Sequence, residues 1–302
     1  MPKRGSLRLD PLALPPYAAF EQACRSGLAR PFGVPPLPDS PWDDGPGHPP
    51  SHPAFGRLRS LVALYETRAL APRRALEVAA GDGRLAAVLA RAGCEVVLND
   101  LRSELLAESL ACYGVSDVVR VVPGNLFDLS REALGRFDLV LAREVIEHVA
   151  HPDRLLAHLA GFLEPGGHLL LTTPNGLHAR NKLPTFSEIG DPSALEPEQF
   201  QPDADGHLFL LTPAEIAALA ASAGLEVERL GAFGTPLTSG HFKLARIAGP
   251  RLVRAAYAAE RLAQRLPAWV RARGCVGLSV LLRRGVGRPG PGASAESSDP
   301  RP

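Results

Sequence analysis

Apolar and polar positions follow two different periods between residues 54 and 173. Short apolar runs predict buried strands, and each run is followed by the spacing of three and four residues that is typical of an amphipathic helix. The first helix is predicted over residues 54–69, the first strand over residues 75–78 and the next helix over Arg84–Arg91. Strands that alternate with helices form a parallel sheet covered on both faces. The pattern therefore predicts an α/β fold.

The alternation ends after Asn175. Residues 176–206 are polar and contain prolines, and a loop of that length inside a compact domain is commonly a lid or a binding segment. A Thr-Pro-Ala-Glu run at residues 212–215 is a capping box with proline at the first helical position. It predicts a helix over residues 213–223, and two later apolar runs predict strands over Leu225–Phe233 and residues 276–284.

The two ends of the chain differ from its middle. The first 53 residues hold 13 of the 30 prolines, which excludes long regular elements there. This arm is interpreted as either disordered or a lid over the substrate, with one short helix over residues 17–29. The Gly-, Pro- and Ser-rich residues 285–302 predict a disordered tail. The predicted domain spans residues 54–284, with insertions at 176–206 and 241–275.

A glycine-containing turn joins the first strand to the helix that follows it. Gly81 and Gly83 allow the backbone to turn tightly and to approach a ligand, and the start of the helix offers unpaired N–H groups. Asp100 ends the next apolar run, where a carboxylate can bind two ribose hydroxyls. The glycine spacing also fits a loose dinucleotide fingerprint, but Glu77 on the strand suits an ammonium group better than a pyrophosphate. These residues predict a site for a nucleoside-bearing cofactor.

Three motifs occur in a fixed order, at residues 77–83, 137–148 and 163–175. With them, the region from about Arg74 to Arg284 resembles the class I S-adenosylmethionine-dependent methyltransferases. The resemblance implies a Rossmann-like seven-stranded sheet in the order 3-2-1-4-5-7-6, with the last two strands at an antiparallel edge.

The resemblance also implies the contacts of the cofactor. The first motif would contact its methionine end, with Ala79 standing where the family usually has a glycine. Asp100 would bind the ribose, and the adenine would lie beside Leu101. The full set of residues implied for S-adenosylmethionine is Glu77, Ala79, Gly81, Gly83, Asp100, Leu101, Asn125, Leu126 and Arg143.

A second cluster follows the fourth predicted strand. If a helix begins there, Glu144, Glu147 and His148 share one face. Glu-x-x-Glu-His resembles the metal-binding motif of ubiquinone-type catechol O-methyltransferases. With His207 before a Phe and a Thr-capped helix, it is also similar to the small-RNA 3′-end 2′-O-methyltransferases. The predicted metal ligands are therefore Glu144, Glu147, His148 and His207, and this donor set suits Mn²⁺, Fe²⁺ or Zn²⁺ better than Mg²⁺.

A mechanism without metal uses the same residues. Methyl transfer from a sulfonium is an in-line displacement that depends mainly on alignment. An oxygen or nitrogen nucleophile still needs its proton removed, either by a base or after a metal lowers its pKa. In the metal-free alternative His148 is the candidate base, and Glu144 with Glu147 orients it.

The segment before the last predicted strand is basic. Residues 241–284 contain ten Lys and Arg and a single acid, Glu260, a balance of +9 in a chain of formal net charge +1. One helix face is predicted to carry Arg251, Arg254, Arg261 and Arg265. The opposite, apolar face is predicted to carry Leu252, Ala256, Ala259, Leu262, Ala263 and Leu266. The segment is interpreted either as a solvated helix on the sheet edge or as a basic cap for a membrane surface, an anionic substrate or an acidic partner.

Length and composition complete the prediction. A chain of 302 residues with 45% hydrophobic content can bury the core of one large domain. Four cysteines without a C-x-x-C pair, the lack of a secretory signal and the lack of a membrane-length apolar run favour a cytoplasmic protein. The predicted function is methyl transfer to a small molecule, with oxygen as the favoured acceptor atom. RNA 2′-O-methylation, which the near-neutral net charge disfavours, and a non-catalytic cofactor-binding subunit are the alternatives.

Overall fold

The computed structural model describes residues 9–16, 18, 58–101, 103–199, 206–238 and 250–286. Apart from residue 18, the predicted helix over residues 17–29 lies outside this part of the chain, as does all but the first two residues of the predicted tail. Within the described residues, none of the helices is both long enough and apolar enough to cross a bilayer.

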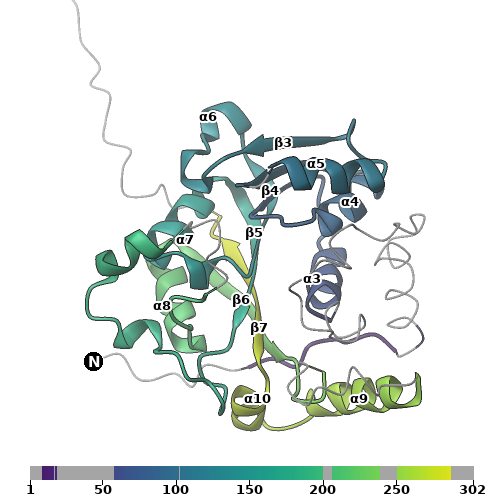
Figure 1. The fold of residues 1–302 in the computed structure, drawn as a ribbon, viewed down its shortest axis with the longest axis vertical. Coiled ribbons are helices and arrows are strands. Elements are labelled where there is room, and N and C mark those ends of the chain that lie inside the picture. Colours follow the sequence, from purple (N-terminus) through teal and green to yellow (C-terminus); the bar gives the residue numbers. More distant parts are fainter. Residues whose placement is uncertain are drawn as a thin grey trace, which may run out of the picture.

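The fold is built on a seven-stranded sheet in the order β3-β2-β1-β4-β5-β7-β6 (Figure 1), which confirms the predicted order. Its strands are β1 Arg74–Val78, β2 Glu95–Asp100, β3 Val119–Pro123, β4 Phe137–Arg143, β5 Leu163–Pro174, β6 Leu225–Phe233 and β7 Gly277–Arg284. The first five strands pair in parallel, and β7 runs antiparallel to both β5 and β6. The carboxyl ends of β1 to β6 therefore lie along one edge of the sheet.

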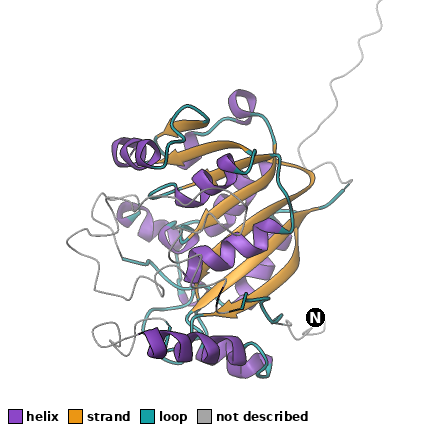
Figure 2. Cartoon of the chain, turned by 90° about the vertical axis from the view of Figure 1, so that its right-hand side faces the viewer, coloured by secondary structure: helices purple, strands orange, loops and turns teal. Residues whose placement is uncertain are grey.

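Helices cover both faces of the sheet, with α3, α4 and α5 on one side and α7 and α8 on the other (Figure 1). The described α-helices are α3 Leu58–Arg68, α4 Arg84–Arg91, α5 Ser103–Cys112, α6 Arg131–Leu134, α7 Pro152–Gly161, α8 Pro213–Ser222, α9 Pro250–Ala263 and α10 Ala268–Gly274. Figure 2 shows the strands as one continuous sheet between these layers. The capping box predicted for α8 is present: Glu215 N donates to Thr212 Oγ1 at 3.3 Å and Thr212 N to Glu215 Oε2 at 2.6 Å.

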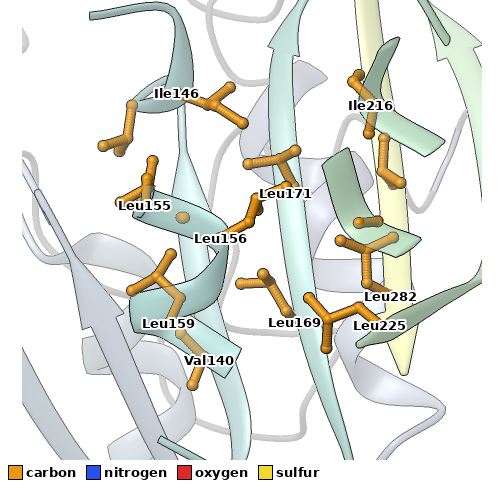
Figure 3. Close-up of a cluster of buried hydrophobic side chains, with 14 of the residues drawn as sticks. Val140, Ile146, Leu155, Leu156, Leu159, Leu169, Leu171, Ile216, Leu225 and Leu282 are labelled. Atoms are coloured by element: carbon orange, nitrogen blue, oxygen red, sulfur yellow. The ribbon is translucent and has the colours of Figure 1, made fainter. Parts of the chain in front are cut away.

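The hydrophobic core forms two clusters because alternate strand residues point to opposite faces. Leu139 and Leu141 of β4 belong to the cluster under α3, α4 and α5, whereas Val140 belongs to the cluster under α7 and α8. In that second cluster Leu155 and Leu159 of α7 lie against strand residues of β4 and β5 (Figure 3). This burial on both faces explains why the central strands read as continuous apolar runs.

The described part of the N-terminal arm closes the outer edge of the sheet. Asp10 forms a parallel bridge with Gly231 of β6, and Arg271 of α10 donates to the carbonyls of Leu9 and Asp10. A side chain at position 231 would overlap Leu12, which is buried there. Residues 9–16 therefore cover a strand edge that would otherwise expose unpaired backbone groups.

The helix α9 differs in one respect from its predicted pattern. Ala256 and Ala263 are buried as expected, but Leu262 and Leu266 are exposed. The apolar face predicted for this segment is therefore covered only in part. Helical spacing identified an apolar stripe, but α9 contacts the rest of the molecule over only part of it.

Glu260 attaches α9 to the end of β6. Its side chain is fully buried, and its carboxylate accepts hydrogen bonds from Gly234 N at 2.9 Å, Thr235 N at 2.7 Å and Thr238 Oγ1 at 2.7 Å. Hydrogen bonds to a buried carboxylate are among the stronger polar contacts in proteins, since the charge is compensated by several donors.

We expect Glu260→Ala to lower the free energy of unfolding by about 2–3 kcal/mol, because it leaves buried backbone N–H groups without an acceptor. Urea denaturation measures this difference. The matched control is Glu226→Ala at an exposed position of β6, where the change should stay within about 0.5 kcal/mol. Equal stability of the two variants would contradict the anchoring role of Glu260.

Candidate functional site

The turn between β1 and α4 has a left-handed backbone at three positions. The φ angles are 47° at Ala79, 61° at Gly81 and 65° at Gly83. At Gly83 space matters as well, because a Cβ would come within 2.8 Å of Leu106 Cδ1. Ala79 keeps the conformation for which glycine is the usual residue, at a cost of about 1 kcal/mol. The departure from the expected motif thus changes a side chain and leaves the path of the backbone unaltered.

Asp100 lies beside this turn at the carboxyl end of β2. Its Oδ2 accepts a hydrogen bond from Gly81 N at 2.9 Å. The next side chain, Leu101, is 52% exposed. An acid at this place, followed by an open apolar side chain, provides one group for a ribose and one surface for a flat ring.

The residues after β3 have unequal surroundings. Asn125 caps a short 3-10 helix, since its Oδ1 accepts a hydrogen bond from Phe127 N at 3.0 Å. Leu126 is buried in the core beneath α7. Its side chain belongs to the packing of the domain, and its backbone follows the carboxyl end of β3.

A buried ion pair joins the centre of the sheet. Glu77 of β1 is 1% exposed, and its Oε1 accepts hydrogen bonds from Arg143 Nε at 2.8 Å and Nη2 at 2.7 Å. Its other oxygen, Oε2, is buried and has no hydrogen-bond partner among the described residues. Burial raises the pKa of Glu77, and the neighbouring guanidinium opposes this shift. A second cationic group would therefore find an acceptor ready at Oε2.

The segment after β4 departs from the predicted helix. Glu144 has a left-handed backbone with φ 55°, and a short 3-10 helix follows over Ile146–His148. The prediction of a helix that begins at the strand end, with Glu144, Glu147 and His148 on one face, is therefore wrong. Glu144 nevertheless stays close enough to Glu147 for its negative charge to act on that carboxylate.

Glu147 is fully buried next to the end of β5. Its Oε2 accepts a hydrogen bond from Thr173 Oγ1 at 3.0 Å, and Leu208 N donates to its backbone carbonyl at 2.9 Å. Its Oε1 is buried without a hydrogen-bond partner in the described chain. Burial, and then the negative charge of Glu144, raises the pKa of Glu147 well above its ordinary value.

Two imidazoles complete a group around this carboxylate. The potential ligand atoms of Glu147, His148 and His207 all lie within 4.8 Å of one another. His207 Nε2 is 3.9 Å from Glu147 Oε1, and the centroids of the two imidazole rings are 5.0 Å apart. His148 Nδ1 lies 3.2 Å from the carbonyl of Gly206. Three of the four predicted ligands are thus brought together.

Glu144 lies outside this group, contrary to the predicted set of four. Its Oε2 forms an ion pair with Arg59 at 3.1 Å. The sequence gives no signal for Arg59, because an arginine on the helix before β1 belongs to no motif and has no distinctive spacing. The same guanidinium, after burial, lowers the pKa of His207. Both effects favour the neutral imidazole, which is the form that binds a metal.

Two further contributors were missed. Asp82 fixes the glycine turn through hydrogen bonds from Arg84 N at 3.1 Å and Tyr113 Oη at 3.0 Å. Thr173 holds Glu147 from the end of β5. A polar residue at the end of a buried strand is the signal that could have identified Thr173, because polar residues at that edge are commonly functional.

The chain is similar in sequence to known proteins. A model of the methyltransferase domain family matches residues 51–230. The ubiquinone biosynthesis O-methyltransferase of Xanthomonas axonopodis pv. citri is 34% identical over 193 residues, which cover 62% of this chain and 76% of that protein. The protein of the same name from Ralstonia nicotianae is 31% identical over 206 residues, with coverages of 65% and 81%.

A solved structure shares the fold. The S-adenosylmethionine dependent methyltransferase from Mesorhizobium loti aligns with a TM-score of 0.50 at 20% identity, and the alignment covers 76% of this chain and 100% of that one. The family model spans more than half of the chain, and the relatives are matched over most of their length. The chain belongs to the methyltransferase domain family and is a class I S-adenosylmethionine-dependent methyltransferase.

Proposed function

We propose that this enzyme transfers a methyl group to an oxygen atom of a small molecule, and that Glu147, His148 and His207 hold a divalent metal for that reaction. The observation that carries the proposal is the buried, unpartnered Glu147 Oε1 beside two imidazoles. The names of the relatives, which are O-methyltransferases, support oxygen as the acceptor atom.

S-adenosylmethionine supplies an electrophilic methyl group on a sulfonium when it is bound. We propose that Glu77 and Arg143 bind the methionine end, which carries one ammonium and one carboxylate group. The unpartnered Glu77 Oε2 supports the contact with the ammonium. Asp100 then binds the ribose, and Leu101 and Asn125 border the adenine. The backbone at Ala79, Gly81, Gly83 and Leu126 completes the wall of this site.

The donor set fits a metal. One carboxylate and two neutral imidazoles suit Mn²⁺, Fe²⁺ or Zn²⁺ better than Mg²⁺. A cation would also compensate the charge of Glu147, whose burial otherwise favours the protonated acid. A bound metal would lower the pKa of an acceptor hydroxyl. Thr173 and the backbone of Leu208 hold Glu147 in place for that role.

The metal-free alternative uses His148 as the base. When its Nδ1 donates to the carbonyl of Gly206, the neutral ring presents Nε2 as the proton acceptor, which is the tautomer that a base requires. Glu147 then orients the site electrostatically. The two mechanisms differ in whether a chelator abolishes turnover.

RNA 2′-O-methylation is the second candidate function, supported by the pairing of His148 with His207. The net charge of +1 counts against it, because nucleic-acid binding is driven by a marked basic excess. Peripheral membrane contact through residues 241–284 is a further proposal, supported by the exposed arginines of α9. The free thiols of Cys94, Cys112 and Cys275 support a reducing, cytoplasmic location.

The first test concerns the cofactor. Calorimetry should detect S-adenosylhomocysteine binding and no NADH binding. Asp100→Ala should weaken binding by about 2 kcal/mol, roughly 30-fold, because it removes a carboxylate that bonds the ribose. Asp117→Ala, at an exposed site before β3, is the control. Tight NADH binding without a response to S-adenosylhomocysteine would exclude the assignment.

The second test concerns the metal. We expect Mn²⁺ to bind the chain in a calorimetric titration, and Glu147→Gln or His207→Ala to weaken that binding on the order of tenfold to a hundredfold. His168→Ala is the control, since His168 contacts Glu228 on the far part of the sheet. Chelation should abolish turnover in the native enzyme.

If Glu147→Gln binds Mn²⁺ as tightly as the native chain, the metal proposal fails. Activity that survives chelation and falls at low pH, as His148 gains a proton, would assign the reaction to His148 as a base.

The third test concerns the charge of Arg59. Because Arg59 lowers the pKa of His207, Arg59→Gln should raise that pKa, so that His207 gains its proton at a higher pH. NMR titration of the imidazole measures the shift. Arg68→Gln, exposed at the end of α3, should leave it in place.

A further inference from the structure

The described surface of α9 and α10 is rich in arginine, and residues 250–275 supply little negative charge of their own. Glu260 is the one acidic residue among residues 250–275, and it is buried against the end of β6. Arg271 is also turned inward, toward the N-terminal segment. The arginines that remain exposed on these two helices and their connection are Arg251, Arg254, Arg261, Arg265 and Arg273.

Large apolar side chains are exposed on the same segment. The exposed fractions are 60% for Leu262, 44% for Leu266 and 71% for Trp269. Leu262 lies in the last turn of α9, and Leu266 and Trp269 follow in the connection to α10 and at its start. Indole and leucine side chains beside arginines are the composition of a segment that lies in the interface of a membrane.

A groove runs along this surface between the N-terminal segment and α9. It encloses about 530 Å³ and has Leu12, Leu14 and Leu262 among its apolar walls. Arg261 and Arg265 line it as well. Apolar walls with two guanidinium groups suit an amphiphile that has an acidic headgroup and a hydrocarbon chain.

The surface of α9 and α10 lies at the same edge of the sheet as Glu147, His148 and His207. Asn175, at the end of β5, donates to the carbonyls of Ala272 and Cys275, and Ala179 N donates to the carbonyl of Arg273. Residues 176–199 thus connect α10 to the segment that carries His207. In Figure 1 α9 and α10 lie next to each other at the end of β6 and β7.

We propose that the α9–α10 surface, formed by Arg251, Arg261, Arg265, Leu262, Leu266 and Trp269, docks on an anionic membrane. The exposed arginines attract acidic headgroups, and the leucines and the tryptophan enter the boundary between the headgroups and the acyl chains. An acidic protein would match the same charge and apolar side chains, and binding to vesicles that contain no protein distinguishes the two partners. Docking turns the edge of the sheet that holds Glu147 toward the lipid, so an apolar acceptor can reach the site from the bilayer.

Vesicle flotation tests the docking. The full chain should float with vesicles of phosphatidylcholine and phosphatidylglycerol at low salt, and should be released at high salt. Arg261→Glu with Arg265→Glu should reduce partitioning on the order of tenfold or more. The charge-matched control is Arg120→Glu with Arg131→Glu, two exposed positions on β3 and α6, at the opposite side of the sheet from α9. Both double variants should bind S-adenosylhomocysteine normally.

Trp269 provides an independent reading of the contact. The chain has two tryptophans, so Trp42→Phe leaves Trp269 as the single emitter. Its emission should shift to shorter wavelength with anionic vesicles and should be quenched by brominated lipids, because the indole enters the interface.

Several outcomes would overturn the proposal. They are equal partitioning to neutral and anionic vesicles, equal loss in the two double variants, and a Trp269 emission that vesicles leave unchanged. Binding of RNA by α9 with no vesicle partitioning would equally exclude a membrane as the partner. Because none of these measurements involves the metal, their result is independent of the proposed chemistry.

Discussion

A buried carboxylate is costly unless a cation or several hydrogen-bond donors compensate it, and this constraint organises the reactive edge of the sheet. Glu77 and Arg143 satisfy it between β1 and β4, the two strands at the centre of the fold. Glu147 satisfies it only in part, since one oxygen is held by Thr173 and the other is unpartnered. The parallel sheet brings both groups to the same edge. One half of the edge thus carries a carboxylate paired with an arginine, and the other carries a carboxylate with one unpartnered oxygen.

The left-handed residue Glu144 separates these two halves. Its backbone reverses the chain after β4, so that Arg143 stays with Glu77 while Glu147 and His148 lie toward β5 and the segment before α8. Arg59 neutralises the carboxylate that is left outside the cluster. A backbone conformation that costs about 1 kcal/mol therefore places neighbouring residues in different parts of the edge. Helix α3 contributes the charge of Arg59 there as well as packing to the core.

The edge of the sheet that carries Glu147 also holds α9 and α10. Glu260 and Asn175 tie these helices to the ends of β6 and β5. Glu260, the one acid among residues 250–275, is buried in this contact, so the exposed side chains of the segment include no acid. A basic and apolar surface is thus exposed at the same edge of the sheet as Glu147.

The sequence by itself determined whatever depends on local spacing. Strand and helix periods, the glycine turn, Asp100 at the end of β2 and the capping box of α8 involve residues that are close in the chain, and backbone geometry fixes their relations. The pairing of His207 with Glu147, the diversion of Glu144 to Arg59 and the exposure of Leu262 were decided by the tertiary structure. A long loop can close in many ways, and a helical stripe does not reveal how much of it a neighbour covers. Those features exist only once distant segments have packed together.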